Sequence, residues 1–186
     1  MGMLDNSLQF SAGQAVTASA ASTYFYDQYT GEKLTTTFTP TPAGIFSKNQ
    51  TYFGEDLGIG KGLGTPRVVV NVGKVFATLT SLQIAFQGAP ENSTAHGSGL
   101  RSDLTFVDYI LSPVIGLSLL TANTRVWAFQ WPMRKTGAGL PRFVQLYYTV
   151  GGANATTGTI KADVLLGDDD AQTTLNQYGS NYSVGA

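Results

Sequence analysis

Only one residue in the chain has the imidazole that most often serves as a catalytic acid or base, the histidine His96. A Ser-His-Asp arrangement would have to combine it with a nearby serine such as Ser98 or Ser102. Neither serine lies in the Gly-x-Ser-x-Gly motif that exposes a nucleophile. The chain also has no cysteine, which excludes disulfides, thiolate metal sites and cysteine nucleophiles. We therefore expect His96 to be a solvated loop residue.

The glycine-rich segment 58–64 fails the tests for a phosphate-binding loop. A dinucleotide-binding fingerprint that used Gly58 and Gly60 would need a third glycine where the chain has Leu63. A P-loop would need Ser or Thr after Lys61, where Gly62 stands. Both kinds of loop precede a helix whose N-terminus receives the anion, whereas this segment precedes a run of valines. The segment is predicted to be a turn that leads into a strand.

The acidic residues do not form a recognisable catalytic or metal-binding set. An EF-hand that began at the aspartate run 168–170 would need Glu at its twelfth position, which is Gly179 here. A solvated acidic turn is the better interpretation of this run. None of the three glutamates lies in a recognisable pair: Glu32, Glu55 and Glu91. We expect a protein that is not an enzyme and that has no metal and no cofactor.

Composition indicates one domain of low charge. The chain has 186 residues, of which 42% are hydrophobic and only 12% are charged, with a net charge of −1. This length suits a single core, and the low content of Lys and Arg argues against a nucleic-acid-binding surface. The longest apolar stretch, 114–120, is too short to span a membrane, and the N-terminus has no secretory signal. We expect a soluble protein, used without export, that binds neither nucleic acid nor membrane.

Alternation of apolar and polar residues predicts β-strands through the second half of the chain. The alternating runs are 82–87, 127–131, 144–150 and 160–166, and Gly-, Pro- or Asn-rich turns bound them, including 151–154. Residues 67–72 are rich in valine, which is typical of a strand buried on both faces, and 104–111 is a further expected strand. Residues 11–22 could form a helix or an extended arm. Together these patterns predict an all-β, antiparallel β-sandwich.

Four regions follow from these patterns. Residues 1–23 are expected to form an N-terminal arm, 24–55 a long insertion rich in Tyr, Phe and Thr, and 56–167 the sandwich core. Residues 168–186 are expected to form a polar C-terminal tail.

Binding to another protein surface is the function that the residues themselves favour. The arm alternates apolar and polar residues without a turn of its own, as a strand that joins a neighbour's sheet would. The insertion carries an excess of aromatic residues, which are favoured at the buried centres of interfaces. An equally open interpretation is that these aromatics form a small second core under a long loop, and carbohydrate stacking is a third. The predicted contact residues are Leu4, Leu8, Phe10, Val16, Tyr24, Phe25, Tyr26, Tyr29, Phe38, Phe46, Tyr52 and Phe53.

Six segments along the chain can be compared with a known family. They are 3–11 (MLDNSLQFS), 14–23 (QAVTASAAST), 56–60 (DLGIG), 64–70 (GTPRVVV), 142–152 (RFVQLYYTVGG) and 158–166 (GTIKADVLL). In this order they resemble the Bbp16-type capsid cement proteins of tailed bacteriophages. None of the six is a catalytic motif, and two features depart from the family: the insertion at 24–55 and the tail after Gly167.

The resemblance implies a jelly-roll-like sandwich that sits on the outer surface of a phage head. There it would clamp neighbouring copies of the major capsid protein and form a homo-oligomer, a dimer or a trimer, after synthesis in the cytoplasm of the bacterial host. The alternative that we keep open is a carbohydrate- or receptor-binding jelly-roll module on a virion.

Overall fold

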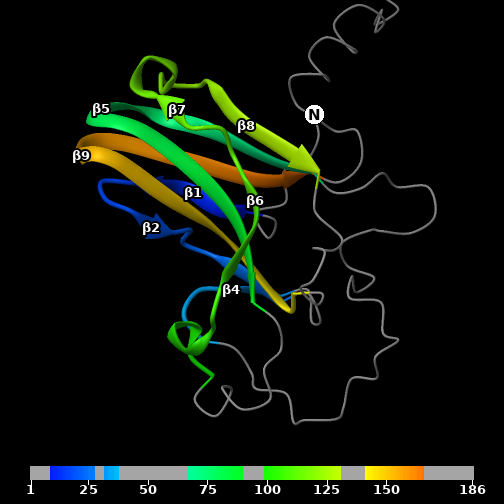
Figure 1. The fold of residues 1–186 in the computed structure, drawn as a ribbon. Helices are drawn as coiled ribbons and strands as arrows, with labels where there is room; N and C mark the ends of the chain where they lie inside the picture. Colours follow the sequence, from blue (N-terminus) through cyan, green and yellow to red (C-terminus); the bar gives the residue numbers. More distant parts are fainter. Residues whose placement is uncertain (1–8, 28–31, 38–66, 90–98, 131–140, 166–186) are drawn as a thin grey trace, which may run out of the picture.

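The structure is a computed structural model that describes residues 9–27, 32–37, 67–89, 99–130 and 141–165 (Figure 1). In these parts the regular elements are β-strands and two short 3₁₀ turns, η2 (Arg101–Asp103) and η3 (Leu117–Leu119). All the strand pairs are antiparallel, so the predicted all-β antiparallel fold is confirmed. The strands are β1 (Gln9–Ala15), β2 (Ala20–Ala21), β3 (Phe25–Asp27), β4 (Glu32–Leu34), β5 (Arg67–Ala89), β6 (Val107–Leu111), β7 (Ile115–Gly116), β8 (Arg125–Gln130) and β9 (Phe143–Leu165).

The two long strands β5 and β9 form one antiparallel ribbon that runs through the whole fold. Their pairing extends from Arg67 opposite Leu165 to Ala89 opposite Phe143. The register shifts repeatedly between Val72 and Ser81, where the ribbon bends (Figure 1). Because the ribbon bends, its two ends contribute to two different layers of the molecule.

The prediction of a turn at 151–154 is wrong, because β9 continues through these residues as one strand. Gly151 and Gly152 lie directly against Ser81 and Thr80 of β5, where a Cβ would not fit. Gly152 also has a positive φ of +81°, which favours glycine. These glycines therefore bend the strand without ending it, since they allow close approach of the two backbones.

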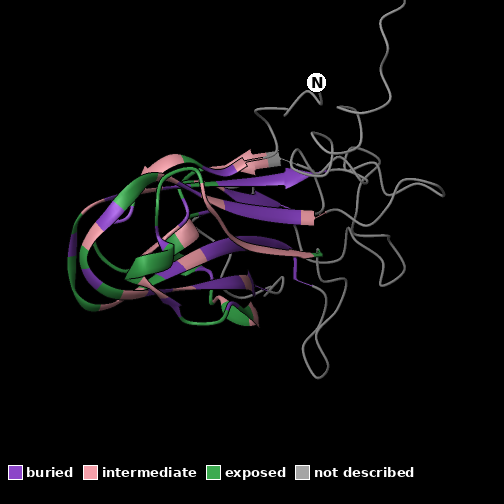
Figure 2. Cartoon of the chain, turned by 90° about the horizontal axis from the view of Figure 1, so that it is seen from above, coloured by how far each residue is buried: buried purple, intermediate pink, exposed green. Residues whose placement is uncertain are grey.

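The strands that flank the ribbon differ at its two ends. At one end the order is β8-β5-β9-β1; at the other, β6 and β7 pair with β5, while β2 and β3 pair with β9 and β4 pairs with β3. The two layers meet through aromatic side chains. Phe86 of β5 contacts Phe10 of β1 and Phe129 of β8 edge-on, with ring centroids 6.2 and 5.4 Å apart. Buried residues line the space between the layers, as in a β-sandwich (Figure 2).

Several expected strands are confirmed with adjusted bounds. Residues 67–72 open β5, with four valines nearly inaccessible to solvent, and 104–111 contains the shorter β6. The open choice at 11–22 is settled in favour of an extended chain, because β1 and β2 lie there.

A buried ion pair joins the start of β9 to β3. Arg142 donates from Nη2 to Asp27 Oδ2 at 2.7 Å and from Nε to both carboxylate oxygens at 3.1 Å. The exposed fractions of the two side chains are 1% and 3%. The guanidinium also lies 4.6 Å from the centroid of the Phe143 ring. Both charges are thus removed from water, and each depends on the other for compensation.

We expect Gly158→Ala to lower the free energy of unfolding by about 2 kcal/mol or more. Gly158 has a φ of +139° and lies against the Phe76 ring, so a Cβ would meet both backbone strain and a core side chain. Urea denaturation followed by circular dichroism measures the change. The matched control is Gly116→Ala, where nothing lies within 4 Å of the added Cβ. Equal stability of the two variants would contradict the requirement for glycine at position 158.

Candidate protein-binding surface

Part of the predicted contact set lies outside the described residues: Leu4, Leu8, Tyr29, Phe38, Phe46, Tyr52 and Phe53. The glycine-rich segment 58–64, His96 and the aspartates 168–170 also lie outside them. The arm and the insertion are therefore described only in part, through residues 9–27 and 32–37, and the predicted tail 168–186 lies wholly outside the described residues.

Four predicted contact residues lie in the interior, so their expected role as a contact surface is wrong for this fold. Phe10 and Val16 are fully buried, as is Phe25, and Tyr26 is 2% exposed. The physical reason is that β1 and β3 both pair with β9 of the same chain. The arm thus completes its own sheet over residues 9–15, and its apolar side chains face its own core. Phe10 and Tyr26 pack edge-on there, with ring centroids 4.9 Å apart.

Tyr24 is the described member of the predicted set that keeps partial exposure. Its backbone N–H donates to the Phe10 carbonyl at 3.0 Å, which fixes its position beside β1. Lys33 Nζ lies 4.4 Å from the centroid of its ring, a cation–π contact from β4. Tyr24 therefore belongs to a small aromatic and cationic surface on the β3–β4 side of the molecule.

Most of the exposed large apolar side chains lie in one stretch of the chain, 107–119, and we call their five side chains the apolar edge. The stretch covers β6, the short β7 and η3, which follow one another along the chain. Val114 and Leu119 are 65% and 62% exposed, and Leu111 is 52% exposed. Large apolar side chains in contact with water can contribute to surfaces that bind other molecules. The apolar edge consists of Val107, Leu111, Val114, Leu117 and Leu119.

Two buried residues anchor the apolar edge to the core. Ile115 is 5% exposed and Leu120 is fully buried, so the segment alternates between side chains that point inward and outward. The Leu120 carbonyl accepts from the N–H of Phe76 at 3.2 Å, and Ile115 lies opposite Leu82 of β5. The outward side chains are therefore held on an ordered backbone, which lowers the entropy that a partner must remove on binding.

Strand β6 lies at the edge of the described sheet. In the described parts of the chain β5 is the only strand that pairs with it. An exposed edge strand with large apolar residues is a template for association. The sequence pattern predicts of the apolar stretch 114–120 only that it is too short for a membrane span. Pro113 and Gly116 are a signal against a long regular element there, and the structure has only the short β7 and η3.

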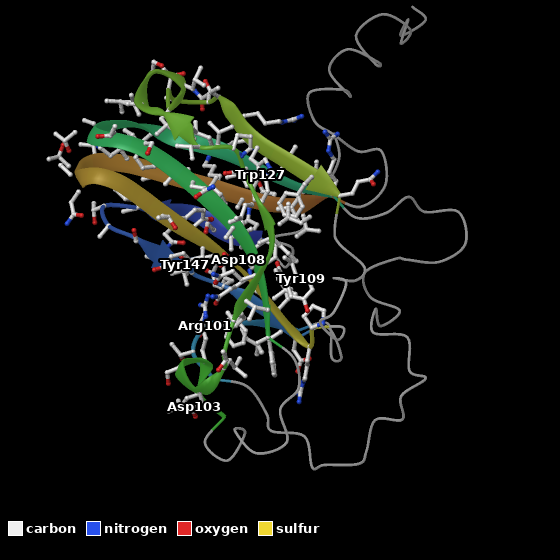
Figure 3. All side chains as sticks on the ribbon, viewed as in Figure 1. Arg101, Asp103, Asp108, Tyr109, Trp127 and Tyr147 are labelled. Carbon is white, nitrogen blue, oxygen red and sulfur yellow. The ribbon has the colours of Figure 1, made fainter. Side chains whose placement is uncertain are left out.

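A chain of hydrogen-bonded polar side chains runs from Arg101 to Asp108 of β6, and Figure 3 labels these two end residues. Arg101 donates from Nε and Nη2 to Gln145 Oε1, at 2.9 and 2.6 Å. Gln145 Nε2 donates to Gln87 Oε1, and Gln87 Nε2 donates to Asp108 Oδ1, both at 2.8 Å. The chain links η2, β9, β5 and β6, so it fixes the orientation of β6. Burial lowers the pKa of Arg101 to about 10, which leaves it charged at neutral pH.

No protein-family model matches this chain, and no curated protein matches it. The functional conclusion therefore comes from the residues and their arrangement. Among the residues that the structure describes, there is no cluster of three or more His, Cys, Asp or Glu side chains that could hold a metal ion. None of the described helices has the length and apolar character needed to cross a membrane. What the described surface offers chemically is non-covalent contact, through the apolar edge and the adjoining polar chain.

Proposed function

We propose that this protein is a capsid decoration or cement protein of a tailed bacteriophage. It binds the outer surface of the head, where it clamps neighbouring copies of the major capsid protein as a homo-oligomer. The observation that carries the proposal is the apolar edge, the set of exposed apolar side chains in residues 107–119 of a sandwich-like fold. The resemblance of six segments to cement proteins adds the nature of the partner.

The proposed mechanism is adhesion through many weak contacts. A contact repeated over a shell becomes strong collectively, because linking contacts raises their effective concentration. An oligomer that spans two capsomers binds only the correctly spaced, mature lattice, and mass action then stabilises that state. The low charge of the chain fits a contact that depends on apolar burial and changes little with salt.

We expect the purified protein to co-sediment with DNA-filled heads that lack it and to detach in mild denaturant. Bound copies should raise the temperature at which the heads lose their DNA, since a ligand of the mature lattice stabilises it. The expected affinity changes less than about tenfold between 50 and 500 mM salt, because screening has little effect on apolar contacts. Heads that bind none of the protein at any salt concentration would contradict the proposal.

Residues 1–8 provide a separate test of the N-terminal arm. Deletion of 1–23 is unsuitable because β1 and β2 lie within it and complete the sheet. Deletion of 1–8 leaves β1 intact. If Leu4 and Leu8 contact the capsid, the shortened protein keeps its stability but occupies fewer sites on the heads. Full occupancy would show that residues 1–8 are not part of the contact surface.

The carbohydrate-binding alternative has one observation in its favour. Tyr147 is partly exposed on β9, close to the polar chain that ends at Asp108 (Figure 3). An aromatic ring beside amide and carboxylate groups can bind a sugar. A glycan array on the purified protein tests this alternative. If the alternative is correct, Tyr147→Ala abolishes the glycan binding of the wild type.

A further inference from the structure

The first residue of β1 lies directly opposite a buried carboxylate. Gln9 pairs with Asp163 of β9, and the register shifts immediately afterwards, between Gln9 and Ser11. Asp163 is only 8% exposed. This cross-strand pair is the first one in the register of β1 with β9.

Two buried oxygen atoms in this pair, Gln9 Oε1 and Asp163 Oδ1, have no hydrogen-bond partner in the part of the chain that the structure describes. Hydrogen bonding from Gln9 favours the charged form of Asp163, and Nε2 is the only donor on the glutamine side chain. A carboxamide and a carboxyl group can join through two hydrogen bonds in a cyclic pair. In such a pair Gln9 Oε1 would face Asp163 Oδ1. If Asp163 is ionised, both of these oxygens are acceptors, and neither can satisfy the other.

We propose that Gln9 and Asp163 form a latch that closes when Asp163 takes up a proton. The protonated Asp163 Oδ1 then donates to Gln9 Oε1, while Asp163 Oδ2 still accepts from Gln9 Nε2. One proton satisfies both unpartnered oxygens and closes a cyclic pair with two hydrogen bonds. Loss of the proton breaks the second bond and leaves two buried acceptors together, which is costly. Acidification therefore strengthens the attachment of Gln9, the first residue of β1, to β9.

The charges around Asp163 determine how strongly it resists ionisation. Burial is the largest influence and raises its pKa, while the hydrogen bond from Gln9 and the charge of Lys161 act in the opposite direction. On β5, Arg67 lies two residues from Val69, the residue opposite Asp163. On β8, Arg125 lies opposite Asn71, which pairs with Lys161. The described strand β1 carries no charged residue, and burial keeps Tyr148 neutral by raising its pKa.

The raised pKa gives the latch a defined direction with pH. The folded state holds the proton more tightly than the unfolded chain, whose aspartates titrate near about 3.9. The protonated latch makes its full contribution to the free energy of folding below the pKa of the unfolded chain. This contribution is lost as the pH rises through the pKa of Asp163 in the folded state. Within this window the unfolding constant rises by up to about tenfold per pH unit, because one extra proton is released on unfolding.

The test compares the wild type with Asp163→Asn across pH 3–8. The asparagine amide can pair with Gln9 at every pH, so the variant represents the closed latch. We expect the ratio of unfolding constants, wild type over variant, to rise with pH above about 4 and then to level off. A ratio that stays constant across the range would overturn the latch.

A second measurement needs no variant and so remains decisive if Asp163→Asn does not fold. Carbon-13 NMR of the wild type follows the Asp163 carboxyl group, and the side-chain amide signals of Gln9 are followed in the same titration. We expect the Gln9 signals to shift with the Asp163 titration, at a pH above that of unfolded aspartate. Titration of Asp163 at or below that pH, or Gln9 signals that do not respond, would overturn the proposal.

Discussion

Replacement of Arg142 by methionine is expected to lower the free energy of unfolding by about 3–5 kcal/mol. Methionine fills much of the volume of the arginine but leaves the Asp27 carboxylate buried without its partner. The carboxylate is 3% exposed, so water cannot replace the lost guanidinium in the folded state. Guanidinium denaturation followed by circular dichroism measures the loss. At 186 residues a loss of this size is a large fraction of the total stability.

Two further variants separate the ion pair from charge removal in general. Lys74→Met deletes an exposed cation from β5 and should change the stability by less than about 0.5 kcal/mol. The double variant Asp27→Leu, Arg142→Met removes both buried charges and should recover much of the loss, because no uncompensated charge remains. If the double variant were no more stable than Arg142→Met alone, the ion pair would not explain the effect.

Period-two patterns were sufficient to predict the fold class, because they depend only on neighbouring residues. The alternating apolar runs 82–87 and 144–150 lie in strands, as does the described part, 160–165, of the run 160–166. The continuity of β9 through Gly151 and Gly152 could not be predicted in this way. A glycine pair permits a turn as readily as a bend in a continuing strand. The bend forms here because the pair lies against Ser81 and Thr80, some seventy residues away.

The burial of the aromatic residues Phe25 and Tyr26 also depends on contacts between residues far apart in the sequence. Composition alone left open whether Phe25 and Tyr26 form an interface or a core. The pairing of Tyr26 with Val144 decides for the core, and no local pattern encodes that contact. The ion pair between Asp27 and Arg142 joins residues 115 positions apart and was likewise invisible in the sequence.

The apolar edge shows why exposure is harder to predict than strand content. Leu111 and Ile110 are neighbours of similar hydrophobicity, yet Leu111 is 52% exposed and Ile110 packs against the core. Their difference follows from the register with β5, where Ala85 lies opposite Leu111 and Phe86 opposite Ile110. A single-residue change of register would exchange the two faces. The surface available to a partner is therefore determined by the pairing of β6 with β5.

The double variant Val114→Asp, Leu119→Asp is expected to lower the affinity for heads roughly 30-fold or more, the scale of losing about 2 kcal/mol at a binding hot spot. The two charges would have to be buried against the partner, whereas in the free protein both positions face water and tolerate them. Titration of each protein against a fixed number of heads, with the bound fraction measured by sedimentation, gives the affinity. Leu100→Asp is the matched control, because Leu100 is 43% exposed but lies outside the apolar edge. Equal thermal stability of all three proteins would show that folding is preserved. Wild-type affinity of the double variant would then exclude the apolar edge as the contact surface.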